Sequence, residues 1–245
     1  MEWLSRTELL LGKDSVDRLK NKRVIVFGVG GVGGYVCEAL ARSGVGYIDI
    51  VDNDTVSLSN INRQIIALNS TVGQYKVDVM EKRMKDINPD ITVQSYNLFY
   101  TPDTEGELDL SGYDYIVDAI DTVSGKISLA VRAEALGIKI ISSMGAGNKL
   151  DPTAFRVADI YKTSVCPLAR AMRTELKKRG VKSLKAVYSE EKAISPDYPE
   201  EMRALKKLPP ASCAFIPSVV GLIVASEVIK DLISMSRNEI EGIRP

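Results

Sequence analysis

Histidine and cysteine are the scarcest of the chemically active residues: the chain of 245 residues has no histidine and three cysteines. Without histidine, Ser-His-Asp and Cys-His catalysis, histidine zinc sites and a histidine proton shuttle are excluded. Cys37, Cys166 and Cys213 lie far apart and form no Cys-x-x-Cys pair. We therefore expect no bound zinc, and the cysteine usage favours a reducing compartment.

Neither sign of charge dominates, since 32 lysines and arginines balance 32 acidic residues. This excludes a strongly basic nucleic-acid-binding protein at the level of the whole chain, although not a basic patch. The longest uncharged stretch, residues 208–226, contains three prolines and predicts a buried or dimer-facing helix, not a membrane span. Residues 1–19 carry charges throughout and resemble no signal peptide, so we expect a cytoplasmic protein without a membrane partner.

Short apolar runs alternate with helical patterns along the first half of the chain. This alternation predicts an α/β fold, with a Rossmann-like, mostly parallel sheet and helices on both faces. An irregular C-terminal portion follows, with a loop over 189–210 and a long helix over 218–235. We expect one domain over residues 1–245, with a nucleotide-binding core at about 20–145 and a substrate and dimer region at about 146–245. The predicted strands are 23–27, 47–52, 92–96, 113–119, 139–143 and 155–160, and the other predicted helices are 31–42, 72–87, 125–136 and 167–179.

A glycine-rich loop follows the first predicted strand and opens the first predicted helix of the sheet. Glycines in this position let the backbone turn tightly and approach a phosphate, while the helix N-terminus supplies N–H donors. Asp52 ends the next strand, where a carboxylate meets a ribose hydroxyl. The pair predicts a nucleotide site without identifying the nucleotide, because a nicotinamide dehydrogenase carries the same features. The glycines concerned are Gly28, Gly30, Gly31 and Gly33.

A second group of polar residues separates adenylation from hydride transfer. Asp54 follows Asp52, and Lys76 comes later in the chain. Between them lies an Asn-x-x-Arg-Gln motif, and an Asp-Ala-Ile-Asp motif follows the fourth predicted strand. Together with the glycine loop, this pattern resembles the ubiquitin-activating-enzyme-like superfamily, which includes the bacterial sulfur-carrier adenylyltransferases. The two motifs consist of Asn60, Arg63 and Gln64 and of Asp118 to Asp121.

The resemblance implies that the protein binds ATP and Mg²⁺. Attack of a carboxylate on the α-phosphorus releases pyrophosphate, and cations neutralise the charge that develops. The guanidinium of Arg63 suits bidentate phosphate contact and Lys76 a point-charge contact. The alternatives are solvated surface charges for these two and turns or helix caps for Asp54 and Asp121. The resemblance implies catalytic roles for Arg63, Lys76 and Asp121, nucleotide contacts for Asp52, Asn60 and Gln64, and Mg²⁺ ligation by Asp121 with Asp54 nearby.

Three features favour one branch of this superfamily. The paired cysteines that thiamine and molybdopterin members usually carry are absent. A Gly-Ala-Gly-Asn-Lys-Leu-Asp-Pro-Thr segment, residues 145–153, follows the fifth predicted strand, and residues 159–163 precede a Cys-Pro-Leu-Ala-Arg segment, residues 166–170. From about Arg6 to Gly180, this arrangement resembles the family of tRNA threonylcarbamoyladenosine dehydratases.

That resemblance implies ATP-dependent cyclisation of N6-threonylcarbamoyladenosine in the anticodon loop of tRNA, through an acyl-adenylate on the threonyl carboxylate. The urea-type group of the same side chain attacks the adenylate. Such an intramolecular step has an effective molarity on the order of 10⁵ M or more, so no cysteine relay is required. We expect Cys37 and Cys213 in the core. Cys166, beside Pro167, is the one thiol that could be accessible, but a packed or helix-capping thiol is the favoured interpretation. Open alternatives are an adenylyltransferase acting on a small sulfur-carrier protein, a nucleotide-binding scaffold and a nicotinamide dehydrogenase.

A basic patch is a candidate tRNA interface. Seven lysines and arginines lie between Arg170 and Lys185, against the single acid Glu175. Phosphates could bind there, although a solvated helix face is the alternative. Relatives in the superfamily are usually homodimers, and some dehydratases work near a cysteine desulfurase and its sulfur acceptor. The sequence shows no separate sign of that partner and leaves a monovalent cation open. The tRNA-binding candidates are Arg170, Arg173, Lys177 and Lys178.

Overall fold

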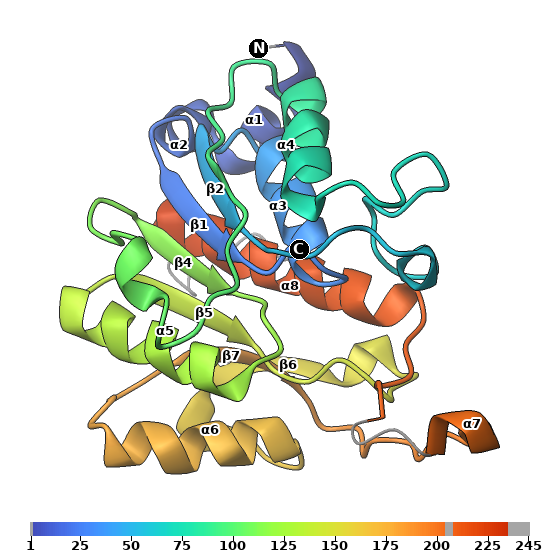
Figure 1. Ribbon diagram of the computed structural model, residues 1–245. Helices are drawn as coiled ribbons and strands as arrows, with labels where there is room; N and C mark the ends of the chain where they lie inside the picture. Colours follow the sequence, from blue (N-terminus) through green and yellow to red (C-terminus); the bar gives the residue numbers. More distant parts are fainter. Residues whose placement is uncertain (1, 204–207, 235–245) are drawn as a thin grey trace.

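A seven-stranded sheet in the order β3-β2-β1-β4-β5-β7-β6 organises the molecule (Figure 1). The computed structural model describes residues 2–203 and 208–234. Neighbouring strands are parallel except β6, which is antiparallel to β7. The expected mostly parallel α/β sheet is confirmed. Its strands are β1 (Arg23–Phe27), β2 (Tyr47–Val51), β3 (Ser95–Tyr96), β4 (Tyr115–Asp118), β5 (Lys139–Ser143), β6 (Phe155–Asp159) and β7 (Lys185–Ser189).

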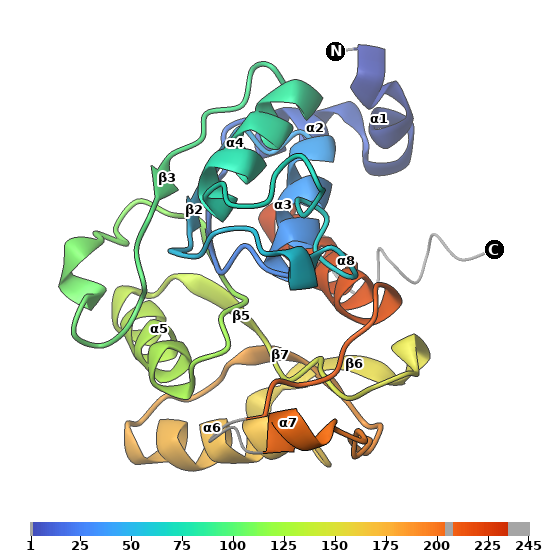
Figure 2. The same cartoon turned by 45° about the vertical axis from the view of Figure 1, so that its right-hand side comes forward.

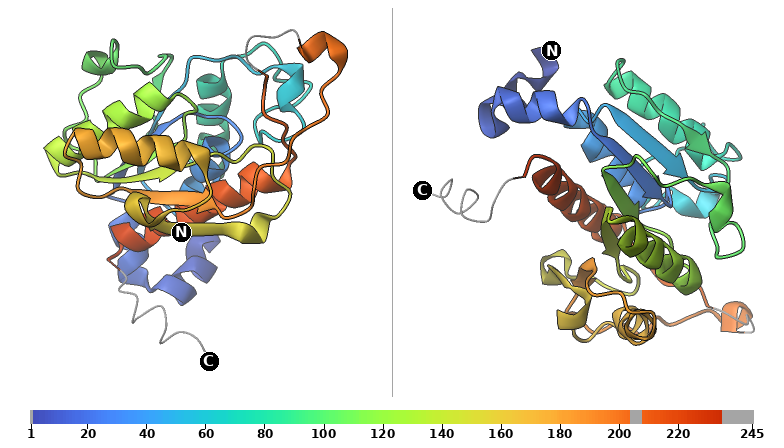
Figure 3. Two further views of the ribbon diagram at one scale, coloured as in Figure 1. Left: turned by 90° about the horizontal axis from the view of Figure 1, so that it is seen from below. Right: turned by 90° about the vertical axis from the view of Figure 1, so that its left-hand side faces the viewer.

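Helices cover both faces of this sheet, as Figures 2 and 3 show. The helices α3, α4 and α8 pack on one face, and α5 and α6 pack on the other. The chain therefore forms three layers, with the sheet in the middle. The helices are α1 (Ser5–Leu11), α2 (Lys13–Leu19), α3 (Gly33–Arg42), α4 (Lys76–Ile87), α5 (Val123–Leu136), α6 (Pro167–Lys178), α7 (Glu200–Arg203) and α8 (Phe215–Leu232).

The side chains of β1 explain why a continuous apolar run becomes a central strand. Successive side chains of a strand point to opposite faces of the sheet. Val24 and Val26 accordingly lie in the core beneath α3 and α8, and Ile25 and Phe27 lie in the core on the α5 side. All four are fully buried. A strand between two helical layers needs apolar residues at every position, which is the pattern that the sequence shows.

The structure differs from the sequence-based boundaries around α4 and β3. The predicted helix 72–87 begins only at Lys76, because Gly73 has a φ of +87° and residues 73–75 pair with the backbone of residues 54–56 instead. The predicted strand 92–96 does run beside β2, with a parallel bridge between Thr92 and Tyr47, but only Ser95–Tyr96 forms a regular strand, β3. The start of the predicted helix was misassigned because residues 73–75 pair with a loop that lies earlier in the chain.

The C-terminal region contains two elements that the sequence did not predict. The strand β7 inserts between β5 and β6, and α7 lies within the predicted loop 189–210. The final helix begins at Phe215, earlier than predicted, and residue 235 of its predicted end lies outside the described residues. The irregular portion and the long last helix are otherwise as expected.

The helix α8 shows how the uncharged stretch 208–226 is used. Val220, Val224 and Val228 are fully buried. At Gly221 a Cβ atom would lie 2.5 Å from the carbonyl oxygen of Val32, so this glycine lets α8 approach α3 closely. Within the described ranges, no helix is both long enough and apolar enough to cross a membrane.

Candidate active site

The carboxyl ends of β1, β2 and β4 meet at the centre of the sheet. The chain proceeds from β1 outward through β2 and β3 on one side, and β4 and β5 lie on the other side. In open parallel sheets, ligands bind at such a switch point, in the crevice beyond the carboxyl ends of the strands. The glycine loop follows β1, Asp52 follows β2 and Asp121 follows β4. The topology therefore brings together three groups that the sequence had separated.

The glycine loop is closed tightly against the exit of β4. Gly28 has a φ of +86°, and a Cβ atom there would lie 2.7 Å from the carbonyl oxygen of Ala119. A Cβ atom on Gly33 would lie only 1.8 Å from the carbonyl oxygen of Gly28. No side chain in the described part of the chain caps the N-terminus of α3. The N–H groups of Gly34 and Tyr35 donate to backbone carbonyl oxygens, but the N–H of Gly33 has no acceptor among the described residues and is available to an anion. Gly30 and Gly31 lie opposite the side chains of Gln64 and Pro217.

The carboxylate of Asp52 is held directly beside this loop. It accepts hydrogen bonds from the backbone N–H groups of Val29, at 2.7 Å, and of Asp54, at 2.9 Å. Burial raises the pKa of Asp52 above its ordinary value, while nearby Lys76 and the two N–H groups oppose the shift. A carboxylate fixed at the end of β2 and at the glycine loop suits contact with a ribose.

The ammonium group of Lys76 is buried and lies between two carboxylates. Its Nζ is 2.6 Å from Oδ2 of Asp54 and 4.0 Å from Oδ1 of Asp52. The side chain of Lys76 is 7% exposed, whereas that of Asp54 is 62% exposed. No hydrogen bond or ion pair joins Asp54 to Asp121 among the described residues. The structure thus makes Asp54 the counter-ion of Lys76.

The Asn-x-x-Arg-Gln motif forms a turn over the loop. The side-chain oxygen of Asn60 accepts the N–H of Ser57, which stabilises the 3-10 helix Leu58–Asn60. Arg63 is partly held, because its Nη1 donates to the carbonyl oxygen of Ser59 and to Asn62, each at 2.9 Å. Its remaining N–H groups have no partner in the residues described, so the guanidinium can still bind a phosphate.

The side chain of Gln64 is 7% exposed, and its Oε1 has no hydrogen-bond partner in the described residues. Because an unpaired buried acceptor is costly, such a group indicates a place for a ligand or a water molecule. Gln64 lies opposite Gly30, where a Cβ atom would be 3.8 Å from its side-chain nitrogen. The orphaned oxygen therefore borders the predicted nucleotide site.

Asp121 is exposed and forms no hydrogen bond or ion pair with any residue that the structure describes. The next side chain, Thr122, has a buried hydroxyl that also lacks a partner. No group of three acidic or cysteine side chains suited to a metal ion exists among the described residues. Mg²⁺ commonly binds through one or two carboxylates together with substrate phosphates and water, so a single free Asp121 fits that ion.

Comparison with known proteins identifies the family. The profile described as "ThiF family" matches residues 4–242 of the chain. The protein belongs to the ThiF family. The tRNA threonylcarbamoyladenosine dehydratase of Bacillus subtilis is 47% identical over 240 residues, which cover 94% of each chain. The crystal structure of the Escherichia coli tRNA N6-threonylcarbamoyladenosine dehydratase in complex with ATP matches with a TM-score of 0.85 and 32% identity, over 95% of this chain and 94% of that one.

A sulfur-carrier type of relative is similar over a shorter range. The adenylyltransferase and sulfurtransferase UBA4 of Saccharomyces cerevisiae is 36% identical over 132 residues, which are 54% of this chain and 30% of that protein. Similarity to the dehydratase therefore covers 94% of this ThiF family member, whereas similarity to UBA4 covers 54% of it.

One of the three cysteines of this ThiF family member differs from expectation. Cys37 is buried as predicted, and burial raises the pKa of its thiol well above the usual range. Cys166 is 4% exposed at the start of α6 and packs in the cluster beneath α5 and α6, which agrees with the favoured interpretation of a packed thiol and not with an accessible one. Cys213, predicted in the core, is only half-buried because it precedes α8 in a surface segment.

The four tRNA-binding candidates on α6 are not equivalent. Arg170 and Lys177 are exposed and have no side-chain partner among the described residues. Arg173 donates to the carbonyl oxygen of Thr163 at 3.0 Å, and Lys178 pairs with Glu175 at 2.7 Å. The last turn of α6 leads through residues 179–184 to the amino end of β7, so its lysines lie away from the glycine loop (Figure 1).

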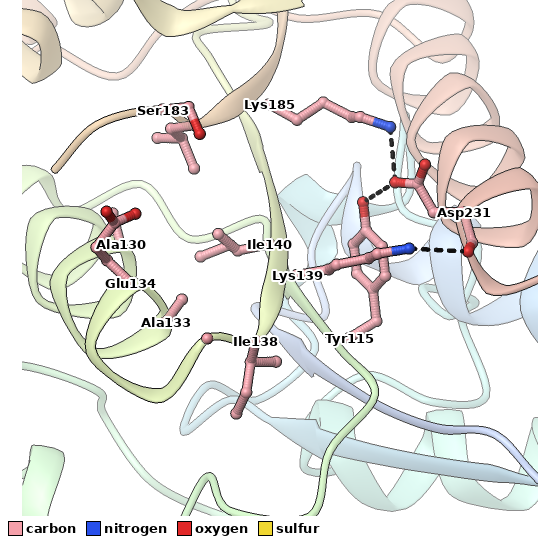
Figure 4. Close-up of a pocket in the computed structure, with 12 residues that line it drawn as sticks. Tyr115, Ala130, Ala133, Glu134, Ile138, Lys139, Ile140, Ser183, Lys185 and Asp231 are labelled. Carbon is pink, nitrogen blue, oxygen red and sulfur yellow. Dashed lines mark hydrogen bonds and ion pairs between the residues drawn. The ribbon is translucent and has the colours of Figure 1, made fainter. Parts of the chain in front are cut away.

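A pocket of about 500 Å³ lies at the opposite edge of the sheet (Figure 4). It is lined by Tyr115, Lys139 and Lys185, the first residues of β4, β5 and β7. Asp231 of α8 satisfies their polar groups: its carboxylate accepts from Tyr115 and from Lys185, both at 2.6 Å, and its carbonyl oxygen accepts from Lys139. None of the predicted site residues lines this pocket.

Sequence reasoning missed one buried charge beside the site. Lys126 is 1% exposed and forms an ion pair with Asp118, which is fully buried. The available signal was a single lysine in the apolar first half of a predicted helix, but lysine is ordinarily taken for a surface residue.

Proposed function

We propose that this protein catalyses the ATP-dependent dehydration of N6-threonylcarbamoyladenosine in tRNA. The threonyl carboxylate is activated as an acyl-adenylate and is then closed into a ring. The observation that carries the proposal is the cationic and carboxylate set around the glycine loop, within a chain that resembles the dehydratases over its whole length. This set is suited to phosphoryl chemistry and requires no histidine or thiol.

The geometry of the glycine loop supports the proposed position of the nucleotide. Asp52, fixed at 2.7 Å from the N–H of Val29, holds the ribose. The N-terminus of α3, the amide of Asn60, the guanidinium of Arg63 and the ammonium of Lys76 face the phosphates. Asp121 supplies the protein carboxylate for Mg²⁺, which neutralises phosphate charge when it is bound.

The reaction proceeds in two steps. An oxygen of the threonyl carboxylate attacks the α-phosphorus, the bond to the β-phosphate breaks, and pyrophosphate carries away the electron pair. Arg63 and Lys76 stabilise the charge that develops on the phosphate oxygens. The urea-type group of the same side chain then attacks the acyl carbon, and AMP leaves with the carboxylate oxygen. The second step is intramolecular, so no protein nucleophile is needed.

The tRNA is proposed to contact α6. Arg170 and Lys177 provide unpaired cations for phosphates, whereas Arg173 and Lys178 are partly committed to Thr163 and Glu175. The orientation of α6 places Arg170 toward the carboxyl ends of the strands and Lys177 toward the other edge. This arrangement supports a role in holding the anticodon stem along the helix, with the modified base at the carboxyl edge.

We also propose a homodimer. Large apolar side chains remain exposed along α8 and in the turn segment before α4. The two regions adjoin, since the side-chain amide of Asn62 donates to the carbonyl oxygen of Ser212. A contiguous apolar surface of this kind is typical of an interface. Light scattering should give twice the chain mass, and a monomer at working concentration would contradict this assignment. The exposed side chains are Leu58, Ile61, Leu68, Phe215 and Leu222.

The remaining partner and location predictions rest on the dehydratase assignment. A cysteine desulfurase with its sulfur acceptor, a monovalent cation and a cytoplasmic location all stay predictions. No described residue is assigned to the desulfurase and its sulfur acceptor or to the monovalent cation.

The decisive experiment supplies purified protein with ATP, Mg²⁺ and tRNA that carries the modified adenosine. Nucleosides are then analysed by mass spectrometry. The proposal expects loss of one water from the modified nucleoside, with AMP and pyrophosphate formed in equal amounts. Adenylation of a small carrier protein without change in tRNA would instead support the sulfur-carrier alternative. Binding of NADH in place of ATP would support a dehydrogenase.

A further inference from the structure

A fully buried ion pair lies immediately below the candidate site. The Nζ atom of Lys126 is 3.0 Å from Oδ1 of Asp118 and 2.7 Å from the carbonyl oxygen of Ser143. It also lies 3.4 Å from Oγ of Ser142, which itself donates to Oδ2 of Asp118 at 2.5 Å. The ammonium group thus has three acceptors, and both carboxylate oxygens are used. No part of the adenylation chemistry described above requires this network.

The network joins three elements at the carboxyl edge of the sheet. Asp118 is the last residue of β4, Ser142 and Ser143 end β5, and Lys126 lies in the first turns of α5. The four residues between Asp118 and α5, residues 119–122, form the loop that carries Asp121. Lys126 therefore ties the far end of this loop to its near end.

The loop has few other constraints on its outer half. Its beginning is fixed, because the N–H of Ala119 donates to the carbonyl oxygen of Phe27 and Ala119 closes against Gly28. Among the described residues, the side chains of Asp121 and Thr122 have no hydrogen-bond partner. The position of Asp121 therefore depends on where α5 begins. The Lys126–Asp118 pair fixes the first turn of α5 to the strand ends, in addition to the apolar packing of Ile127 and Leu129.

Stability alone does not account for a buried pair of this kind. Removing two charges from water costs much of what their attraction returns, and well-packed apolar replacements are often as stable. The ladder between β4 and β5 already aligns Asp118 with Ser142 without the lysine. What the lysine adds is a connection from these strand ends to α5.

We propose that Lys126 is a positioning residue for Asp121. By linking α5 to the ends of β4 and β5, it holds the Asp121 carboxylate in the orientation that binds Mg²⁺ on the nucleotide phosphates. This inference rests on the proposed function, and it assigns Lys126 no contact with the nucleotide.

The test removes both charges together, as D118N/K126M, so that no unpaired charge stays buried. Isothermal titration measures ATP affinity with and without Mg²⁺, and the ratio is the gain in affinity due to the metal. Wild-type protein should show a clear gain. The paired variant should bind ATP alone normally and lose about tenfold to 100-fold of the gain, the usual cost of removing a group that orients a metal ligand.

The control removes an ion pair at the other edge of the sheet, in which the carboxylate is buried but the cation is partly exposed. Arg23 and the buried Asp49 form an ion pair at 2.8 Å, far from the loop that carries Asp121. R23M/D49N should lower the melting temperature without changing the gain due to Mg²⁺. If D118N/K126M folds and keeps the wild-type gain and kcat, Lys126 is structural only and the inference is wrong.

A combined variant separates positioning from general damage. If Lys126 acts through Asp121, then D118N/K126M/D121N should bind Mg–ATP no more weakly than D121N alone, because the losses share one cause. Additive losses would overturn the inference. If D118N/K126M does not fold, Ser142→Ala replaces it in the test. This variant should also lose part of the affinity gain due to Mg²⁺, although less than the paired variant. An unchanged gain in Ser142→Ala would overturn the inference.

The same titrations distinguish this inference from the proposed function. Wild-type protein that binds no ATP, or gains nothing from Mg²⁺, contradicts the proposed function itself. Wild-type protein with a metal-dependent gain that the paired variant retains contradicts only the role of Lys126.

Discussion

The two edges of the sheet differ in whether their polar and charged side chains have partners. At the amino ends of the strands, Tyr115, Lys139 and Lys185 line a pocket, but all three are bound by Asp231. At the carboxyl ends, polar atoms of Gln64, Thr122 and Asp121 have no partner among the described residues.

A folded chain ordinarily pairs its buried polar atoms, so atoms left without a partner indicate where another molecule is expected. The pocket of about 500 Å³ lies at the edge where the charges are already paired. We therefore base the proposed site on the polar atoms without partners and not on the volume of a pocket.

The largest effect is expected from truncating the charged side chains of Arg63 and Asp121 at the carboxyl edge. Arg63→Ala and Asp121→Ala should each lower kcat by about 100-fold to 1,000-fold, which corresponds to about 2.7–4 kcal/mol. Arg63 stabilises the developing phosphate charge directly, whereas Asp121 would hold the Mg²⁺ that neutralises it. Lys139→Ala, at the amino edge, is the matched control and should turn over at the wild-type rate. Near-normal turnover of both carboxyl-edge variants, measured on folded protein, would show that these residues are misassigned.

The pH dependence of ATP binding through Asp52 provides a second test of the carboxyl edge. Asp52→Asn should weaken ATP binding by about 10-fold to 100-fold, since a hydrogen bond to a charged group is worth about 1.5–3 kcal/mol. Burial raises the pKa of the Asp52 carboxyl above 3.8, so the ionised form needed by the ribose is lost on acidification earlier than for an exposed aspartate.

ATP affinity of the wild type should therefore fall as the pH drops toward that raised pKa, and Asp52→Asn should remove this part of the pH dependence, because an amide does not titrate in this range. The stability change has the opposite sign. A raised carboxyl pKa favours the folded state below pH 3.8, and that contribution is lost as the pH rises through the folded-state pKa. Titration calorimetry across the acid range tests the binding change, and an unaltered pH profile in the variant would contradict the role of Asp52.

A smaller effect, on tRNA binding, is expected for the exposed cations of α6, which covers one face of the sheet. Arg170→Ala should weaken tRNA binding a few-fold at all sequences and reduce the slope of log affinity against log salt by about one, as loss of a phosphate contact does. Lys82→Ala on α4 removes an equally exposed cation from the opposite face and should leave both values unchanged. Equal salt slopes for wild type and Arg170→Ala would assign α6 to solvent.

The smallest catalytic effect is predicted for the cysteines, which belong neither to the candidate site nor to the pocket at the amino edge. A variant with Ala at positions 37, 166 and 213 should keep its turnover, because the adenylate is attacked within the substrate. Loss of the buried Cys37 and Cys166 should cost about 1–3 kcal/mol of stability, visible as a lower melting temperature. If folded Cys166→Ala consumes ATP without forming the ring, a covalent relay exists.

Local patterns account for the parts of the site that sequence could predict. The run Val24–Phe27, the glycines behind it and Asp52 lie within 30 residues, and each is specified by its own neighbours. Sterics alone then require glycine at Gly28 and Gly33, because backbone oxygens occupy the places where a Cβ atom would be.

Long-range placement accounts for what the sequence could not predict. The strand β7 becomes a strand only because it is inserted between β5 and β6. Lys126 is buried only because Asp118 and Ser143 from two other elements surround it. The sequence left open whether Cys166 is packed or accessible, and packing of α6 on α5 decides this by covering it. Partners distant in sequence decide each of these cases.

Exchange of labelled pyrophosphate into ATP tests the central claim most directly, because it reports formation of the adenylate at the carboxyl edge. We predict exchange that requires tRNA carrying threonylcarbamoyladenosine, persists in Lys139→Ala and is about 100-fold or more slower in Asp121→Ala. Exchange that proceeds equally without tRNA, or that is undiminished in Asp121→Ala and fails in Lys139→Ala, would contradict this claim.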